Sequence, residues 1–197
     1  MGSPKILHAG CGQTKIPGSI GLDIVDIKDT VDIVHDLNDF PYPFENDYFD
    51  EIHFYHVLEH LDNPIKVVEE MHRILKNSGS FYLRVPHYSS MGAFSDITHK
   101  RPFGYSSFDC FEETNPYHFY TDVDYEIVKK KIKYLAHYPN NGIYDQYLYK
   151  NTCPLIFRPA VLALNFLISL SPMFFERFWC YLVGGATEID VVLKKRT

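Results

Sequence analysis

The chain has 197 residues, of which 46% are hydrophobic and 22% are charged. This composition is typical of a globular domain with one sizeable core, and it excludes a disordered, collagen-like or coiled-coil chain. The formal net charge of -6 comes from 19 basic and 25 acidic residues, which argues against a general nucleic-acid-binding function. We therefore expect a single domain spanning residues 1–197.

Two features bear on the cellular compartment. The N-terminal residues MGSPKILHAGCG lack the ordered charged lead, apolar run and cleavage site of a signal peptide. The cysteines Cys11, Cys110, Cys153 and Cys180 are scattered without a CxxC pair, which is typical of reduced thiols. We expect a cytoplasmic protein.

Short apolar runs alternate with loops in the first half of the chain. Each run is bounded by Gly, Pro or Asp, which is typical of the buried strands of a parallel sheet. The expected strands are residues 5–9, 19–23, 31–35, 50–55 and 80–85.

One helix is clearly marked between the fourth and fifth expected strands. Asp62 or Asn63 can cap it, and Pro64 suits its first turn. Lys76 and Gly79 indicate where it ends. A single apolar stripe at helical spacing is formed by Ile65, Val68, Met71, Ile74 and Leu75. A helix between two strands at this spacing forms a right-handed parallel crossover, so the fold class is α/β.

The second half of the chain has a different character. Residues 88–122 form a long loop rich in His, Tyr and Phe, which we interpret as a substrate loop or lid. Alternation favours a strand over residues 124–134 and an edge-like strand over residues 187–193.

The segment before the last strand is strongly apolar. Residues 155–183 contain an uninterrupted apolar run, 160–170, that is shorter than the roughly 20 residues needed to span a bilayer. We interpret 155–183 as a helical insertion that caps the domain or forms a homodimer face. Peripheral contact with a membrane surface or a lipid-linked acceptor is the alternative.

Polar groups follow three successive strands of the predicted sheet. Gly10 and Gly12 follow the first strand, Asp23 ends the second, and Asp36 follows the third. Glycines let the backbone approach a ligand closely, and open α/β sheets bind ligands at this edge. A tight turn without a ligand remains the alternative for the glycines alone. Neither a full GxGxxG nor a Gly-Lys-Ser/Thr motif is present, which favours a ligand with ribose and adenine but no pyrophosphate.

Five segments follow one another along the chain: ILHAGCG, IGLDI, VHDLNDFPYPFENDYFDEI, HVLEHL and RILKNSGSFYLRVPH. With these segments in this order, the chain resembles class I S-adenosylmethionine-dependent methyltransferases of the small type 11 family. The resemblance covers residues 4–87, the expected cofactor-binding half. It implies a Rossmann-like, doubly wound, mostly parallel sheet with a helical and aromatic cap. It also implies S-adenosylmethionine as cofactor and S-adenosylhomocysteine as product.

The same resemblance assigns cofactor-binding roles residue by residue. The implied cofactor-binding residues are His8, Ala9, Gly10, Cys11, Gly12, Asp23, Ile24, Asp36, Leu37 and His56. Two departures from the family pattern are the missing third glycine and the near absence of a helix between the first two strands. Both predict a more open cofactor site than in typical members.

The segment His56-Val-Leu-Glu59-His60 matches the HxxEH pattern of a class of zinc peptidases. Its place directly after a buried strand, and the lack of an identifiable acidic third ligand, argue against that chemistry. We expect no metal and retain a zinc hydrolase as an alternative. Without a metal, we expect Glu59 and His60 to orient the loop after the fourth strand by hydrogen bonds.

The long loop supplies the candidates for the acceptor side. His87 and His99 are the candidate catalytic bases, because imidazole titrates near neutral pH. Tyr88, Lys100 and Arg101 are candidate substrate-binding residues. The alternative is that His99, Lys100 and Arg101 pin the loop through structural hydrogen bonds.

The sequence therefore predicts methyl transfer from S-adenosylmethionine to a small-molecule or glycan-type acceptor. A non-catalytic S-adenosylmethionine-binding protein, acting as a regulator or partner subunit, is the alternative from another class.

Overall fold

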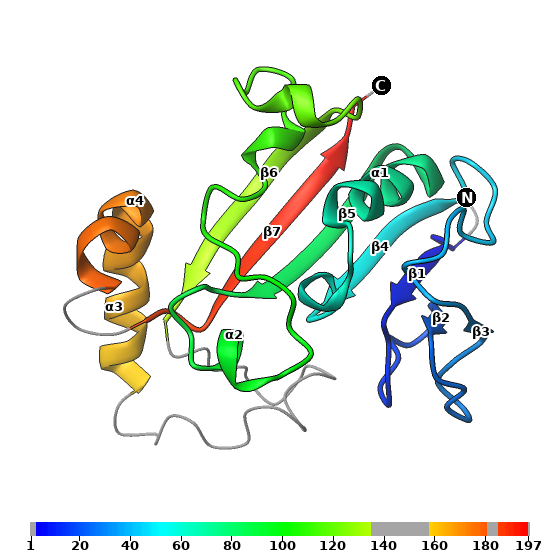
Figure 1. The fold of residues 1–197 in the computed structure, drawn as a ribbon, viewed down its shortest axis with the longest axis horizontal. Coiled ribbons are helices and arrows are strands. Elements are labelled where there is room, and N and C mark those ends of the chain that lie inside the picture. Colours follow the sequence, from blue (N-terminus) through cyan, green and yellow to red (C-terminus); the bar gives the residue numbers. More distant parts are fainter. Residues whose placement is uncertain (1–2, 135–157, 181–184, 197) are drawn as a thin grey trace.

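The computed structural model describes residues 3–134, 158–180 and 185–196. Within these ranges seven strands form one sheet in the order β3-β2-β1-β4-β5-β7-β6 (Figure 1). The strands are β1 Ile6–Ala9, β2 Ile20–Asp23, β3 Ile33–Val34, β4 Phe49–Tyr55, β5 Leu75–Pro86, β6 Tyr125–Lys133 and β7 Glu188–Lys195. β1 to β5 pair in parallel, and β7 runs antiparallel to both of its neighbours. The mostly parallel, Rossmann-like sheet predicted from the sequence is confirmed.

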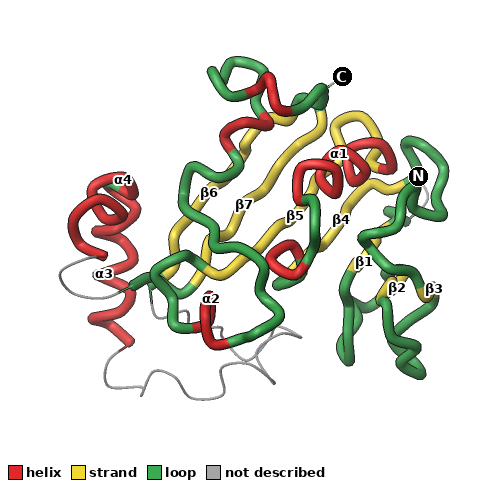
Figure 2. Tube along the Cα trace, in the orientation of Figure 1, coloured by secondary structure: helices red, strands yellow, loops and turns green. Residues whose placement is uncertain are grey.

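Figure 2 shows the helical segments in red, separate from the yellow strands of the sheet. They are η1 Leu58–His60, α1 Pro64–Ile74, α2 Gly92–Ser95, η2 Asp109–Phe111, η3 His118–Tyr120, α3 Arg158–Leu170, α4 Pro172–Phe174 and the π-helical turn η6 Phe175–Trp179. In the described chain, the connections from β1 to β2 and from β2 to β3 contain no helix. For the connection from β1 to β2, the sequence predicts this.

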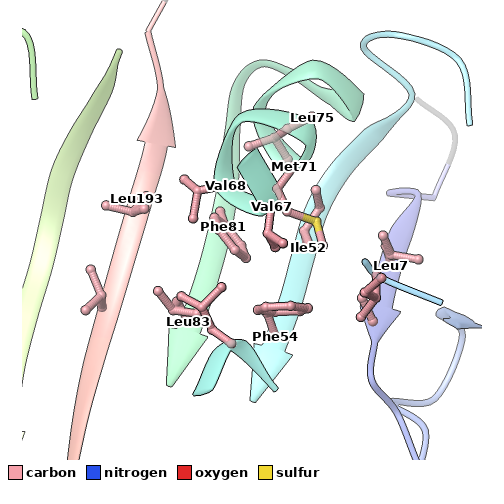
Figure 3. Close-up of a cluster of buried hydrophobic side chains, with 14 of the residues drawn as sticks. Leu7, Ile52, Phe54, Val67, Val68, Met71, Leu75, Phe81, Leu83 and Leu193 are labelled. Carbon is pink, nitrogen blue, oxygen red and sulfur yellow. The ribbon is translucent and has the colours of Figure 1, made fainter. Parts of the chain in front are cut away.

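The main core lies between α1 and one face of the sheet (Figure 3). The helix begins as predicted, and of the two candidate N-caps it is Asn63 that caps it: the Asn63 side chain accepts a hydrogen bond from the Lys66 N–H at 3.1 Å. Of its apolar stripe, Val68, Met71 and Ile74 are fully buried against the strands, and Ile65 is partly buried. The packed side chains include Leu7, Ile52, Phe54, Val67, Val68, Met71, Phe81, Leu83 and Leu193. Their burial fixes α1 over β4 and β5, and so fixes the loops at the ends of these strands.

The end of α1 differs from the prediction. The helix stops at Ile74, and Lys76 and Gly79 already lie in β5. The Lys195 side chain from β7 reaches this point, and its Nζ donates to the carbonyl oxygens of His72 at 3.0 Å and Leu75 at 2.8 Å. A cation at a helix C-terminus satisfies carbonyls that have no partner within the helix.

Both strands predicted in the second half are present. Residues 124–134 contain β6, and residues 187–193 lie largely in β7. However, β7 is an interior strand between β5 and β6 and not the edge strand that its alternation suggested. The alternation arises because one side of β7 faces the main core and the other side faces a polar sheet surface.

The apolar segment forms α3, α4 and η6, and Figure 1 shows α3 and α4 near the end of the sheet that is farthest from β1–β3. Ile168 and Phe175 pack with Ile132 and Ala186, and so join this unit to the sheet. Several other large apolar side chains are exposed: Leu162, Phe166, Leu167, Leu170, Phe174 and Phe178. Residues 155–157 and 181–183 of the predicted segment lie outside the described residues.

None of the described helices is by itself long and apolar enough to cross a membrane. The pair Pro159–Leu170 and Pro172–Trp179 meets the length and composition criteria only together, and it is bent by 101° at the break.

Lys195→Met is expected to reduce the free energy of unfolding by about 1–3 kcal/mol. The substitution leaves the carbonyls of His72 and Leu75 without their donor. Lys194→Met, on the other face of β7, is the matched control and should change stability little. Urea denaturation of both variants tests this, and equal losses would contradict the role of Lys195.

Candidate functional site

The glycine loop follows β1 at the point where the strand order reverses. β1 lies between β2 and β4, and ligands of open α/β sheets bind at such a switch point, beyond the carboxyl ends of the strands. Gly10 has a φ of +68°, and a Cβ there would lie 2.2 Å from the Val57 side chain. Gly10 is therefore required for packing between the ends of β1 and β4.

Gly12 differs from Gly10. Its φ is +51°, and no atom lies within 4 Å of the position that a Cβ would occupy. The Gly12 N–H donates to Asp23 Oδ2 at 2.8 Å, and Asp23 Oδ1 accepts from the Val25 N–H at 3.2 Å. The structure thus brings two predicted residues, Gly12 and Asp23, into direct contact. Open space beside Gly12 leaves the cradle that a close-approaching ligand needs.

His8 and Cys11 lie beneath this loop. His8 is fully buried, and its Nδ1 accepts from the Ile16 N–H at 3.3 Å. Burial, with the nearby His53, lowers the pKa of His8 to about 3, so the ring is neutral. Burial, with Asp23, raises the pKa of the Cys11 thiol to about 11. Both side chains support the loop, and neither is charged near neutral pH. Ala9 is fully buried at the end of β1.

The residues predicted to contact ribose and adenine lie on neighbouring strand ends. The His35 N–H donates to the Asp23 carbonyl at 2.9 Å, which joins the ends of β2 and β3. Asp36 Oδ1 accepts from the backbone and the side chain of Asn38, at 2.8 and 3.1 Å. Leu37 is buried, whereas the Ile24 side chain is 61% exposed beside Asp23. Ile24 therefore offers an open apolar surface next to the carboxylate.

His56 follows β4 in the left-handed backbone region, with a φ of 56°. Its Nε2 lies 3.1 Å from Glu188 Oε1, and its Nδ1 lies 3.5 Å from Glu59 Oε1. Burial alone would lower the pKa of His56, but the contacts with Glu188 and Glu59 outweigh it and raise the pKa to about 9. His56 is thus a cation between two buried carboxylates near neutral pH.

His87, a predicted base, is fully buried after β5. Its Nε2 lies 2.9 Å from Glu176 Oε1, and its Nδ1 lies 2.7 Å from Ser89 Oγ. The Tyr88 hydroxyl donates to the Glu176 carbonyl at 2.9 Å. His87 and Tyr88 thus connect the end of β5 to η6.

Lys100 and Arg101 are held by the segment after β4. The two Arg101 Nη atoms donate to the carbonyls of Leu61 and Asp62 at 2.7 and 2.8 Å. Lys100 Nζ pairs with the Asp62 carboxylate, and the Lys100 N–H donates to the Glu59 carbonyl at 2.8 Å. This is the loop-pinning arrangement that the sequence left open as the alternative to substrate binding.

His99, the other predicted base, is brought against His60 and Glu59 by the pinned loop. The rings of His60 and His99 meet edge to face with centroids 4.6 Å apart. His99 Nε2 lies 3.9 Å from Glu59 Oε1, and its side chain is 10% exposed. Of the two predicted bases, His99 is therefore the more accessible.

Sequence reasoning missed three residues of this region. Glu188 at the start of β7 contacts His56, and Arg84 in β5 lies 3.7 Å from Glu188 Oε2. Glu176 in η6 receives hydrogen bonds from His87 and from the Tyr105 N–H. Their partners lie far away in the sequence, and no local motif marks them. Glu176 alone carried a local signal, because it is an acidic residue within an otherwise apolar segment.

Residues 22–83 match the family model described as a methyltransferase domain, type 11. A search of curated proteins found no match. Among solved structures, a SAM-dependent methyltransferase from Archaeoglobus fulgidus has a TM-score of 0.60 and 17% identity, over 98% of this chain and 87% of that chain.

Two further solved structures show the range of proteins that share the fold. The complex of the Haloferax volcanii Trm112 methyltransferase activator with a methyltransferase gives a TM-score of 0.56 and 14% identity, over 98% of this chain and 83% of that chain. The 4+2 cyclase SpnF has a TM-score of 0.55 and 10% sequence identity, over 100% of this chain and 76% of that chain.

The fold is thus the Rossmann-like fold of class I S-adenosylmethionine-dependent methyltransferases. Residues 22–83, from β2 into β5, match a methyltransferase-domain model, and S-adenosylmethionine is the cofactor that such a domain implies. The similarity to a cyclase means that the fold alone does not determine the chemistry.

Gly10→Ala is expected to destabilise the protein more than Gly12→Ala. Both substitutions place a Cβ on a residue with positive φ, at a cost of about 1–2 kcal/mol. Only Gly10→Ala also forces the Val57 side chain to move. Thermal or urea unfolding of the two variants compares them, and a Gly12 variant as unstable as the Gly10 variant would contradict the packing role.

Glu176→Ala is expected to lower the free energy of unfolding by about 1–3 kcal/mol, because the buried His87 ring and the Tyr105 N–H lose their acceptor. Glu176→Gln keeps one carbonyl oxygen at this point and is the matched control, with a smaller expected loss. Urea denaturation measures both. If neither variant were destabilised, this connection between β5 and η6 would not contribute to stability.

Proposed function

We propose that this protein transfers a methyl group from S-adenosylmethionine to a small-molecule or glycan-type acceptor. The observation that carries the proposal is the contact between Gly12 and Asp23 at the switch point of the sheet. A glycine loop with open space beside it and an acid at the end of β2 suit the methionine and ribose parts of this cofactor. The methyltransferase-domain match to residues 22–83 supports the same assignment.

The residues at the strand ends fit the proposed cofactor. A carboxylate has about four acceptor sites, so Asp23 keeps capacity for ribose hydroxyls beyond its bonds to two backbone N–H groups. The exposed Ile24 and the strand end at Asp36 and Leu37 would flank the adenine. When bound, the cofactor supplies an electrophilic methyl group on a positively charged sulfur. His56, as the residue after β4, would border the methyl position.

The chain's own task on the acceptor side is to orient the nucleophile, exclude water and accept a proton from a hydroxyl acceptor. The partly exposed His99 is better placed for this than the buried His87. The residues pinning the loop, Lys100 and Arg101, would act by holding His99 in position. Tyr88, bonded to the Glu176 carbonyl, would shape the floor of the acceptor region.

The two alternatives make different predictions. A non-catalytic binding protein would bind S-adenosylmethionine but methylate no acceptor. A zinc hydrolase of the HxxEH type would need His56 and His60 on one helical face, but His56 has a positive φ and precedes the short turn η1. The structure thus favours the methyltransferase over the hydrolase.

Calorimetric titration with S-adenosylmethionine, and separately with S-adenosylhomocysteine, tests the cofactor site. We expect both to bind.

Asp23→Ala should weaken the binding of S-adenosylmethionine by about 1–3 kcal/mol, because a hydrogen-bonding carboxylate is lost. Asp26→Ala, an exposed acid on the same loop, is the matched control. No binding by folded wild-type protein would overturn the proposed function, and an unchanged affinity in Asp23→Ala would remove this residue from the site.

A second measurement separates an enzyme from a binding protein. The protein is incubated with S-adenosylmethionine carrying a labelled methyl group and with hydroxyl-bearing small molecules and glycans. Transfer of label to an acceptor supports the proposal. Cofactor binding without transfer across the panel favours the regulatory alternative.

A further inference from the structure

We propose that Glu59, His60 and His99 form a binding site for a divalent transition-metal ion. One ligand atom from each of these residues lies within 4.8 Å of the other two. Glu59 and His60 lie on η1 after β4, and His99 comes from the loop after β5. In the sequence, Glu59 and His60 are adjacent, but His99 lies about forty residues away, so the sequence did not group the three donors. The third donor is thus a histidine, whereas an HxxEH zinc peptidase requires an acidic third ligand.

The buried Glu59 carboxylate is the first observation behind the site. Its side chain is only 1% exposed, and among the described residues no group donates a hydrogen bond to either of its oxygens. The nearest cation is His56, with Nδ1 at 3.5 Å, but His56 lies closer to the equally buried Glu188, at 3.1 Å. Glu188 has a second cation nearby, because Arg84 Nε lies 3.7 Å from Glu188 Oε2, whereas the Glu59 oxygens have no hydrogen-bond donor among the described residues. A buried carboxylate without a donor is costly, and a bound cation would lower that cost.

The orientation of the two imidazole rings is the second observation. His99 Nδ1 lies 3.3 Å from the Ala93 carbonyl, which can only accept, so this nitrogen carries the proton and Nε2 is left as a donor to a metal. The Thr98 hydroxyl bonds to Asp96 Oδ1 at 2.6 Å and therefore accepts from His60 Nδ1 at 2.9 Å. Both rings thus present an unprotonated Nε2. Metal-binding histidines generally donate their other N–H in this way to a carbonyl or an anchored acceptor.

The loop-pinning contacts hold the donors together without a metal. The Lys100 N–H donates to the Glu59 carbonyl at 2.8 Å, next to His99 in the sequence. The Arg101 guanidinium bridges the carbonyls of Leu61 and Asp62, next to His60. These bonds join the segment 59–62 to the segment 99–101.

The distances between the donor atoms are close to those in a metal site. Ligand atoms around an ion with bonds of about 2.1 Å lie roughly 3.0–3.5 Å from one another, so the donor atoms need to approach each other by about 1 Å.

The donor set indicates the kind of ion. Two imidazoles and one carboxylate suit Zn²⁺, Mn²⁺, Fe²⁺ or Co²⁺, whereas Mg²⁺ and Ca²⁺ prefer oxygen ligands. Three protein ligands leave coordination positions open for water or for an oxygen of another molecule. On the proposed function, that molecule is the acceptor: a bound ion would hold its hydroxyl oxygen and lower the pKa of that hydroxyl. His99 would then act as a metal ligand and not as a base.

Metal binding is measured without cofactor or acceptor, so that the result does not depend on methyl transfer. Tag-free protein is stripped with a chelator, which is then removed, and is titrated with Co²⁺ while the visible absorption of the bound ion is followed. Zn²⁺ is then added as a competitor. Wild-type protein is compared with Glu59→Gln, His60→Gln and His99→Gln. The control is His118→Gln, since His118 is also partly buried and bonded to a backbone carbonyl, at Cys110, but lies outside the cluster.

We expect wild-type protein and the His118 variant to bind equimolar Co²⁺ and to release it to Zn²⁺. Each of the other three variants should bind at least about tenfold more weakly. If Glu59→Gln does not fold, the two histidine variants carry the test, because their side chains are partly exposed. Absence of binding by folded wild-type protein, or equal binding by all variants, would overturn the metal site. Titration with S-adenosylmethionine on the same samples shows separately whether the cofactor site is intact.

Discussion

The pairing of His56 with two buried carboxylates constrains the arrangement of the strand ends. Glu59 follows β4, and Glu188 begins β7, yet both carboxylates lie against the one imidazole. Buried charges are costly unless they are paired, so this contact fixes where β7 can lie relative to the loop after β4. Arg84 extends the arrangement, because it lies near Glu188 and forms a 2.6 Å ion pair with Asp190. The positive φ of His56 is kept because these groups surround it.

The proposed acceptor side is organised mainly by bonds that join its loop to residues 59–62 and to η6. Arg101 and Lys100 bond to the main chain of residues 59–62, and Glu176 binds the start of the loop after β5 through His87. A loop that is anchored at residue 87 and again at residues 100–101 holds the segment between these points. This accounts for the position of His99 against His60 and Glu59 in a region with little regular secondary structure.

The sequence predicted well those features that depend on neighbouring residues. The strand ends, the N-cap Asn63 and the Gly12–Asp23 pair belong to local motifs with fixed spacing. The features that were wrong or missed depend on distant partners. Gly79 looked like a helix stop, but α1 ends earlier, where Lys195 bonds to the Leu75 carbonyl from 120 positions away. The contact between His87 and Glu176 was missed, because the two residues are 89 positions apart in the sequence.

The two halves of the site differ in how they are built, and this bears on how they would work together. The proposed cofactor side rests on short strands, β1 to β3, and on a glycine loop with open space beside Gly12. The proposed acceptor side is held by charged and hydrogen-bonded contacts within the protein itself. Methyl transfer requires the acceptor atom to be aligned with the methyl group, and alignment costs least when one partner is already held rigidly. Rigid placement of Glu59, His60 and His99 therefore suits groups that orient an acceptor, while the open glycine loop suits a cofactor that enters and leaves in each cycle.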